Sequence, residues 1–280
     1  MSTYAAVTPP APVVEPPARF RDLLGAEWIK MWSLRSTGWM LALAALFALG
    51  TAALAALGDY HNFPRYPPQV QREHMFALGD AFPLEGYLTL MLVAASVGAI
   101  TMVSEYGSGL IRTTTVAVPA RGSVLLAKAV VVTAVWTVAG AFIATGTFVV
   151  SQSILDLRDA AVSVTDPSVF RALVASALLA PICALIGLGF GVLIRHAAAT
   201  VITSIFVLLM LPLFFASDSR WSATLDQAML LTAWQRLTVD WVPTGPDVRI
   251  ATITESWIVY AVWPLVATLV ALVVVRRRDV

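Results

Sequence analysis

Six long apolar runs dominate the sequence and restrict the folds that it can adopt. They cover residues 37–57, 84–103, 123–150, 172–194, 197–216 and 256–275. Each is close to, or longer than, the ~20 residues that an α-helix needs to cross about 30 Å of hydrocarbon. Backbone polar groups in lipid must be satisfied internally, so such a run crosses the membrane as a helix. The sequence therefore predicts an all-α, polytopic membrane protein with six transmembrane helices.

The composition agrees with this prediction. Only 12% of the residues are charged and 59% are hydrophobic, with a mean hydropathy of +0.80. Water-soluble domains carry about 25% charged residues. The net charge of +1 gives no reason to expect a nucleic-acid partner. The single cysteine, Cys183, excludes an internal disulfide, and its apolar surroundings predict a small packing residue.

The segments outside the apolar runs predict one transmembrane domain with a tail. Residues 1–18 are rich in proline and lack the basic and apolar regions of a signal peptide, so we expect a disordered cytoplasmic tail. Residues 19–280 then form a single six-span domain, with an outer segment over 217–255. His61 and His74 are 13 residues apart without a nearby cysteine, and we predict no metal site and no bound cofactor.

Charge placement predicts the orientation. Eleven of the 18 lysines and arginines fall on the side that carries both termini, and seven fall on the other side. The more basic side of a membrane protein faces the cytoplasm, so both termini are predicted to be cytoplasmic. The 16 arginines against two lysines fit a GC-rich bacterial genome, and hence a bacterial plasma membrane.

A stretch before the first run, residues 19–36, has the spacing of an amphipathic helix. Its apolar arc includes Trp28 and Trp32, which suit the membrane–water interface, while Lys30 lies opposite and Glu27 interrupts the arc. We expect an interfacial helix that lies along the inner leaflet and bends into the first span. The alternative is a cytoplasmic start of the first span whose long side chains reach the interface.

The polar interruption between the second and third runs, residues 104–128, is not explained by membrane crossing. Gly107 and Gly109 weaken the end of the second span, and Pro119 ends any helix that precedes it. Residues 107–118 can form one short helix along the membrane surface between two spans. Such a helix could pass motion from a soluble partner into the spans. The alternative is an ordinary basic cytoplasmic loop.

The outer segment before the sixth run has helical spacing over residues 222–237, with Ser222 as the expected N-cap. The sequence WVPTGP at 241–246 then forces a turn. This helix is too short and too charged to cross, so we expect a re-entrant or surface-lying outer helix. Pro181, Pro212 and Pro264 lie within spans, where each either kinks its helix and allows hinge motion or serves packing alone.

The order of residues in the interruption between the second and third runs resembles that of a known family. Glu105, Gly109, Arg112, Pro119, Arg121 and Lys128 follow one another there. This order is similar to that in the membrane subunits, or permeases, of type-2 ABC exporters. The opening GAEWIKMWSLRSTGW, residues 25–39, also resembles the start of such permeases, especially actinobacterial ones. The likeness extends over nearly the whole chain.

The resemblance implies a function that spacing alone does not give. The chain would be the permease of an ATP-driven exporter that moves a hydrophobic or amphipathic substrate out of the cell. It would pair with a second permease chain, expected to be a copy of itself, and with a separate ATPase that binds ATP and Mg²⁺. The cytoplasmic coupling helix between spans two and three would dock on that ATPase, anchored by Glu105 and flanked by Arg112 and Arg121. The alternatives are a solvated charge for Glu105 and simple positive-inside anchoring for the arginines.

The chain itself is not expected to be an enzyme. It contains no GxxxxGK[ST] loop, so it would not hold ATP phosphates by that mechanism. The GLGFG stretch at 187–191 lies inside an apolar run, which favours close helix packing over cofactor binding. We expect a substrate path lined by hydroxyl and aromatic side chains: Ser96, Thr101, Trp136, Thr137 and Thr203. Two other functions stay open, an integral membrane enzyme acting on lipids and a non-transporting membrane anchor for a partner protein.

Overall fold

The structure, a computed structural model, describes residues 19–33, 35–110, 120–215, 220–239 and 251–277. Every regular element in these ranges is helical, which confirms the predicted all-α fold. Six helical stretches are long and apolar enough to cross a membrane. Five of them are built on α2 (Arg35–Asn62), α5 (Leu84–Gly107), α7 (Arg121–Leu155), α8 (Pro167–Ile194) and α13 (Ile253–Arg277). The remaining stretch consists of α9 (Ala197–Ile205), the π-helix η3 (Phe206–Met210) and α10 (Leu211–Phe215).

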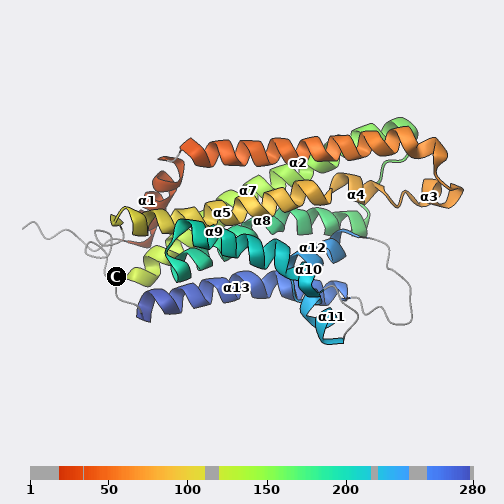
Figure 1. The fold of residues 1–280 in the computed structure, drawn as a ribbon. Helices are drawn as coiled ribbons and strands as arrows, with labels where there is room; N and C mark the ends of the chain where they lie inside the picture. Colours follow the sequence, from red (N-terminus) through yellow and green to blue (C-terminus); the bar gives the residue numbers. More distant parts are fainter. Residues whose placement is uncertain (1–18, 34, 111–119, 216–219, 240–250, 278–280) are drawn as a thin grey trace, which may run out of the picture.

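Shorter helices fill the ends of the bundle. They are α1 (Phe20–Ser33), η1 (Phe63–Arg65), α3 (Pro68–Glu73), α4 (Ala77–Ala81), η2 (Asp156–Arg158), α11 (Arg220–Gln227) and α12 (Leu230–Thr238). The long helices lie side by side, with α1 running across one end and α3, α4 and α12 gathered at the other (Figure 1). We call these the α1 end and the α4 end. The last turn of α13 also lies at the α1 end. The predicted tail, residues 1–18, lies outside the described residues.

The long helices extend beyond the apolar runs that predicted them. Helix α8 begins at Pro167, five residues before the predicted start of the span. Its N-cap is Asp166, whose side chain accepts a hydrogen bond from Ser168 N at 2.8 Å, and proline fits the first helical position. The capping residue and the polar residues at a helix end do not belong to the apolar run, so hydropathy alone underestimates the length of the helix.

Helix α8 is the centre of the bundle because small residues let its neighbours approach closely. A Cβ atom added at Gly187 would lie 1.9 Å from the carbonyl oxygen of Ala95 on α5. A Cβ atom at Gly98 of α5 would lie 2.0 Å from the carbonyl oxygen of Ala184 on α8. These contacts confirm that the glycines at 187–191 serve helix packing.

The outer segment differs from its prediction. In place of one helix over 222–237, the chain forms α11 and α12, separated at Ala228 and Met229. Ser222 is not an N-cap but lies inside α11, where its hydroxyl donates to the carbonyl of Phe215. The break lets α12 turn its apolar side into the bundle, which one straight helix would not do. The predicted turn at 241–246 lies outside the described residues.

The structure places all three prolines that lie within spans. Pro181 and Pro264 lie inside the continuous helices α8 and α13. Near Pro212 the span changes to the π-helix η3 directly before α10. Proline lacks a backbone donor and clashes with the preceding turn, and a π-turn accommodates such a defect.

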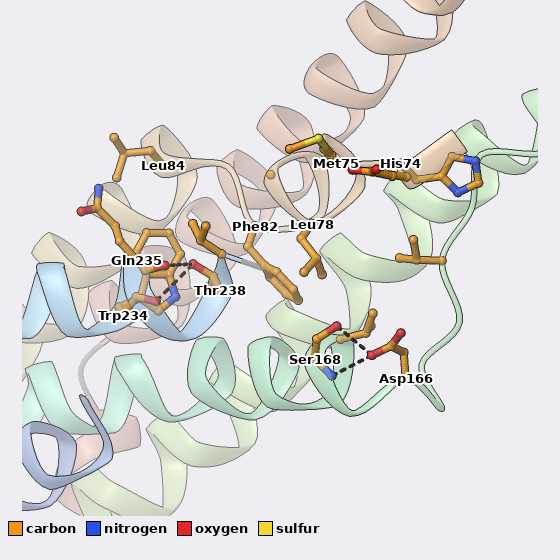
Figure 2. Close-up of a pocket in the computed structure, with 15 residues that line it drawn as sticks. His74, Met75, Leu78, Phe82, Leu84, Asp166, Ser168, Trp234, Gln235 and Thr238 are labelled. Carbon is orange, nitrogen blue, oxygen red and sulfur yellow. Dashed lines mark hydrogen bonds between the residues drawn. The ribbon is translucent and has the colours of Figure 1, made fainter. Parts of the chain in front are cut away.

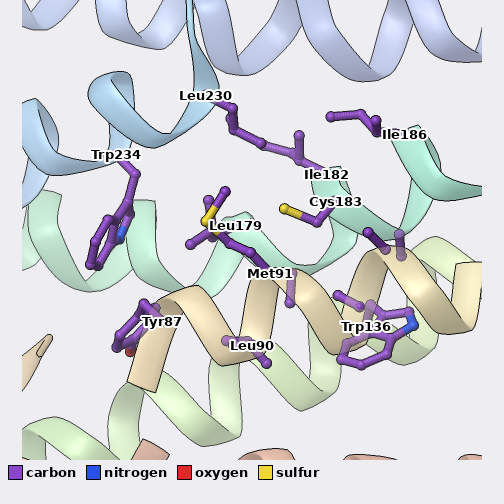
Figure 3. Close-up of a cluster of buried hydrophobic side chains, with 14 of the residues drawn as sticks. Tyr87, Leu90, Met91, Trp136, Leu179, Ile182, Cys183, Ile186, Leu230 and Trp234 are labelled. Atoms are coloured by element: carbon purple, nitrogen blue, oxygen red, sulfur yellow. The ribbon is translucent and has the colours of Figure 1, made fainter. Parts of the chain in front are cut away.

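At the α4 end, parts of α3, α4, α8 and α12 surround a cavity (Figure 2). Deeper in the bundle, α12 packs into the core beside α5 and α8 (Figure 3). The rings of Tyr87 and Trp234 stack with centroids 5.0 Å apart. Trp234 Nε1 donates to Ser176 Oγ at 3.1 Å, so the indole has a partner despite full burial. Cys183 is buried in this core, as predicted.

The outward faces of α2 and α13 are apolar and exposed. On α2 the exposed side chains include Trp39, Leu43, Leu46, Phe47 and Leu54, and on α13 they include Ile258, Leu265 and Leu269. Water-soluble monomers rarely expose contiguous apolar patches of this extent. The faces therefore suit a hydrocarbon environment, in agreement with a multi-pass membrane protein.

Candidate functional site

Four charged side chains from three helices meet at the α1 end. Glu27 and Lys30 come from α1, Glu105 from the last turn of α5, and Lys128 from about two turns into α7. We call these residues the ionic tetrad. Lys30 and Lys128 are the only two lysines of the chain, so both take part in the same cluster.

The tetrad is a closed ring of hydrogen-bonded ion pairs. Lys30 Nζ donates to Glu27 Oε1 at 2.7 Å and to Glu105 Oε1 at 2.9 Å. Lys128 Nζ donates to Glu27 Oε2 at 2.5 Å and to Glu105 Oε1 at 3.0 Å. Each ammonium group thus bridges both carboxylates. Because Glu27 and Lys30 are three residues apart on α1, they share one helix face and can reach the same partners.

The ring is largely withdrawn from solvent. The side chains of Glu27, Glu105 and Lys128 are 4–6% exposed, and that of Lys30 is 32% exposed. Two negative and two positive charges cancel, which is the condition under which buried charges are tolerated. Well-packed apolar residues stabilise a protein as much as a buried ion pair does or more, whereas removing one partner costs about 3–5 kcal/mol. The tetrad joins α1, α5 and α7 through these hydrogen-bonded ion pairs.

Lys30 lies on α1, outside the membrane-spanning helices. Burial by itself lowers the pKa of its ammonium group, but hydrogen bonds to Glu27 and Glu105 and the charges of both residues outweigh burial, so the pKa of Lys30 is raised above 10.5. A raised lysine pKa contributes stability that is complete below the unfolded pKa and is lost as the pH rises through the folded pKa. Lys30 is consequently charged throughout the physiological range.

A cavity of about 250 Å³ lies directly beside the tetrad. All four tetrad residues line it, together with the hydroxyl-bearing residues Thr101, Ser104 and Ser108 and the apolar Leu110. The chain leaves α5 here through Gly109, whose φ of 71° is in the left-handed region that glycine favours. Gly109 lies within the predicted coupling segment, residues 107–118, and Arg112 and Pro119 lie outside the described residues. The tetrad and its cavity are thus next to the point where that segment begins.

Helix α7, which follows the predicted coupling segment, begins at the same α1 end of the bundle. Arg121 is the first residue of α7 and is half-buried. Lys128 follows two turns later and is buried rather than placed at the membrane surface. Of the residues predicted at the ATPase contact, the structure brings Glu105 and Lys128 together and places Gly109 and Arg121 at the two edges of the predicted segment.

Helix α1 turns its faces differently from the helical-wheel expectation. Glu27, which interrupts the apolar arc, is buried together with Met31, and Lys30 reaches inward from the side predicted to be polar. Trp28 and Trp32 are 49% and 46% exposed, with ring centroids 5.8 Å apart. A buried carboxylate is tolerated here because Lys128 comes from another helix, which no wheel of α1 can include. The tryptophans remain available to an interface.

The residues predicted to line the substrate path do not form one cluster, unlike those of the tetrad. The five residues are spread over three elements: Ser96 and Thr101 on α5, Trp136 and Thr137 on α7, and Thr203 on α9. Thr101 lines the cavity beside the tetrad. Trp136 is 1% exposed and is packed in the hydrophobic core (Figure 3). A role in packing therefore accounts for Trp136 without a substrate.

The sequence reasoning missed the pairing within the tetrad and a second polar cluster at the α4 end. The sequence did contain one indication of the pairing within the tetrad: only two of its 18 basic residues are lysines, and both belong to the tetrad. In the second polar cluster, Tyr66 donates from its hydroxyl to Asp59 Oδ1 at 2.6 Å, and the buried Asp80 lies beside Asp59. The bond to Asp59 raises the pKa of Tyr66 to about 12. Within the described ranges no group of three or more His, Cys, Asp or Glu side chains could hold a metal ion.

Comparison with known proteins adds no relative. No family model matches the sequence, and no curated protein matches it. The resemblance to exporter permeases therefore rests on the motifs and on their order along the chain.

Proposed function

We propose that this chain is the membrane-spanning subunit of a type-2 ABC exporter in a bacterial plasma membrane. In this proposal the α1 end faces the cytoplasm and a separate ATPase supplies the energy. A second copy completes the translocation unit, and the substrate is a hydrophobic or amphipathic molecule that moves outward. ATP and Mg²⁺ bind to the ATPase and not to this chain.

The observation that carries the proposal is the ionic tetrad. A docked ATPase would push on the segment between α5 and α7, and that push must reach the spans without being lost in local bending. The tetrad ties the end of α5, the start of α7 and the interfacial helix α1 into one joint. Apolar side chains can slide past one another, whereas charge-assisted hydrogen bonds of 2.5–3.0 Å hold one register.

The position of the joint also supports the proposal. It lies near Gly109, at the beginning of the predicted coupling segment of residues 107–118, and α1 crosses the same end of the bundle (Figure 1). A force applied there would move three helices together. A lipid-modifying enzyme would instead need reactive polar groups gathered around a substrate cavity, and the tetrad groups are already bonded to one another.

The first experiment is co-purification. The full chain is solubilised from membranes of its host in mild detergent, and any associated ATPase is scored by mass and by ATP hydrolysis. We expect an ATPase to accompany the native chain and to be lost when Arg112 and Arg121 are both changed to glutamate. If no ATPase accompanies a folded native chain, the proposal is wrong and a lipid-modifying activity becomes the one to test.

The second experiment separates docking from coupling. Glu105→Gln and Lys128→Met are combined, which removes one charge of each sign from the tetrad and keeps it neutral. A fluorophore is attached through Leu157→Cys at the α4 end, where the native side chain is 72% exposed and where the buried Cys183 does not compete for the label. In the complex with its ATPase, ATP should change the fluorescence of the labelled native chain.

With the tetrad variant we expect ATP hydrolysis to continue while the fluorescence response is lost. The matched control is Arg21→Gln with Asp22→Asn, which also removes one charge of each sign from an ion pair, in this case an exposed pair on α1 with a 3.6 Å separation. It should respond as the native chain does. An unchanged response in the tetrad variant would refute the role of the tetrad in coupling.

A further inference from the structure

The cavity at the α4 end is a feature that the proposed function does not use. Its volume is about 570 Å³, within the roughly 300–1,000 Å³ typical of small-molecule sites. Its walls come from α3, α4, the beginning of α5, the beginning of α8 and α12. It lies at the opposite end of the bundle from the ionic tetrad (Figure 1).

The inner wall of this cavity is apolar and fixed. Leu78, Phe82, Val169 and Trp234 line it and are each at most 9% exposed. Figure 2 shows Leu78 and Phe82 pointing from α4 and its end towards the start of α8. Trp234 is held by stacking on Tyr87 and by the hydrogen bond to Ser176 already described. The wall is therefore preformed, so a ligand need not order it.

The rim of the cavity carries charge of one sign. Glu73 and Asp166 line it, with one histidine, His74, and the described lining contains no lysine or arginine. Ser168 donates to Asp166 Oδ1 from its backbone at 2.8 Å and from its hydroxyl at 2.7 Å. These bonds lower the pKa of the Asp166 carboxyl, which keeps it ionised at neutral pH.

The charge of Arg171 on α8 acts on Asp166 and adds to the lowering of the pKa of that carboxyl, but the Arg171 side chain is held at the end of α12 and does not line the cavity. Arg171 donates from Nε to the carbonyl of Leu237 at 3.0 Å and from Nη2 to that of Val239 at 3.4 Å. In this position it ties the end of α12 to α8 and so shapes one wall. The cavity thus combines an apolar, aromatic interior with two carboxylates at its rim.

We infer that the cavity at the α4 end binds a hydrophobic cation, a molecule with an aromatic or branched apolar body and one quaternary or protonated centre. The body would fill the space between Phe82 and Trp234, and the cationic centre would lie towards Glu73 and Asp166. Aromatic faces add to the attraction for a cation, whereas an anion of the same shape would meet two like charges. This inference goes beyond the proposed function, because binding requires neither ATP nor a partner chain.

The test uses two ions of the same shape and opposite charge. The full chain is placed in lipid nanodiscs, and binding of radiolabelled tetraphenylphosphonium and tetraphenylborate is measured by equilibrium dialysis, with empty nanodiscs subtracted. We expect the phosphonium to bind about tenfold or more tightly than the borate. Equal binding of both ions, or no binding above empty nanodiscs, would overturn the inference.

Two pairs of variants locate the binding. Glu73→Gln with Asp166→Asn removes both rim charges, and asparagine preserves the N-cap of α8. This variant should weaken phosphonium binding about tenfold. Glu85→Gln with Asp156→Asn removes two exposed charges from the same end of the bundle but outside the cavity lining, and it should change binding less than about twofold.

Gly79→Leu is designed to fill the cavity from a position where an added Cβ atom meets no neighbour. Gly79 lines it, lies in α4, and has no atom within 4 Å of an added Cβ. The matched control is Gly58→Leu on α2, which is equally free of neighbours and does not line the cavity. We expect Gly79→Leu to abolish phosphonium binding and Gly58→Leu to leave it unchanged. Native-like binding in Gly79→Leu would show that the ion binds elsewhere and would refute the assignment.

Discussion

Replacing Lys128 by methionine tests the tetrad at its buried lysine. The side chain of Lys128 is 5% exposed and makes two charge-assisted hydrogen bonds, to Glu27 at 2.5 Å and to Glu105 at 3.0 Å. Methionine has a similar length but no charge, so the variant leaves two buried carboxylates with Lys30 as their only tetrad cation. Breaking a buried pair in this way lowers the free energy of unfolding by about 3–5 kcal/mol.

The loss of free energy of unfolding caused by Lys128→Met should depend on whether Glu27 is charged. Glu27→Gln alone leaves two ammonium groups around Glu105, and we expect a loss of about 2–4 kcal/mol. Combining Lys128→Met with Glu27→Gln restores neutrality and leaves the bond between Lys30 and Glu105. The double variant should lose only about 1–2 kcal/mol, which gives a coupling energy of at least about 3 kcal/mol.

The assay is reversible unfolding in mixed micelles by titration with dodecyl sulfate, followed by circular dichroism of the helical signal. Arg21→Met serves as the control, because Arg21 forms an exposed pair with Asp22 at 3.6 Å. Its effect should stay within about 0.5 kcal/mol. If the losses of the two single variants add to that of the double variant within about 0.5 kcal/mol, the tetrad is not an energetic unit and the reasoning fails.

Two further predictions concern other parts of the bundle. Gly98→Ala would place a methyl group 2.0 Å from the carbonyl oxygen of Ala184 and should lower the free energy of unfolding by about 1–3 kcal/mol or more in the same assay. The control, Gly50→Ala, meets nothing within 4 Å and should be neutral or slightly stabilising. Equal effects of the two variants would contradict the close contact between α5 and α8. The hydrogen bond to Asp59, together with burial and the Asp59 charge, raises the pKa of Tyr66 to about 12. Asp59→Asn weakens that bond and removes the charge, so Tyr66 should ionise nearer its usual pH of 10, as measured by ultraviolet absorbance against a Tyr66→Phe reference. The stability that this bond contributes is present below pH 10 and is lost as the pH rises from 10 to 12, and an unshifted titration in Asp59→Asn would rule out the assigned cause.

Some parts of the site could be predicted from the sequence and others could not. The polar interruption at residues 104–128 marked Glu105 and Lys128, and the amphipathic stretch before the first span marked Glu27 and Lys30. Their meeting could not be predicted, because Glu27 and Lys128 are 101 residues apart and are joined only when α1 packs across α7. Similarly, nothing in the spacing of residues 222–237 indicated the break that turns α12 into the core.

The sequence by itself determined the number and type of spans. Lipid offers no hydrogen-bonding partners, so a run of about 20 apolar residues crosses the membrane as an α-helix. The hydropathy of the sequence is therefore enough to predict it. Only the tertiary structure decided which charges are paired and where a cavity remains, because these depend on contacts between helices that are distant in the chain. The tetrad at one end and the acidic, aromatic cavity at the other both arise from such contacts, through the close packing that small residues such as Gly98 and Gly187 permit.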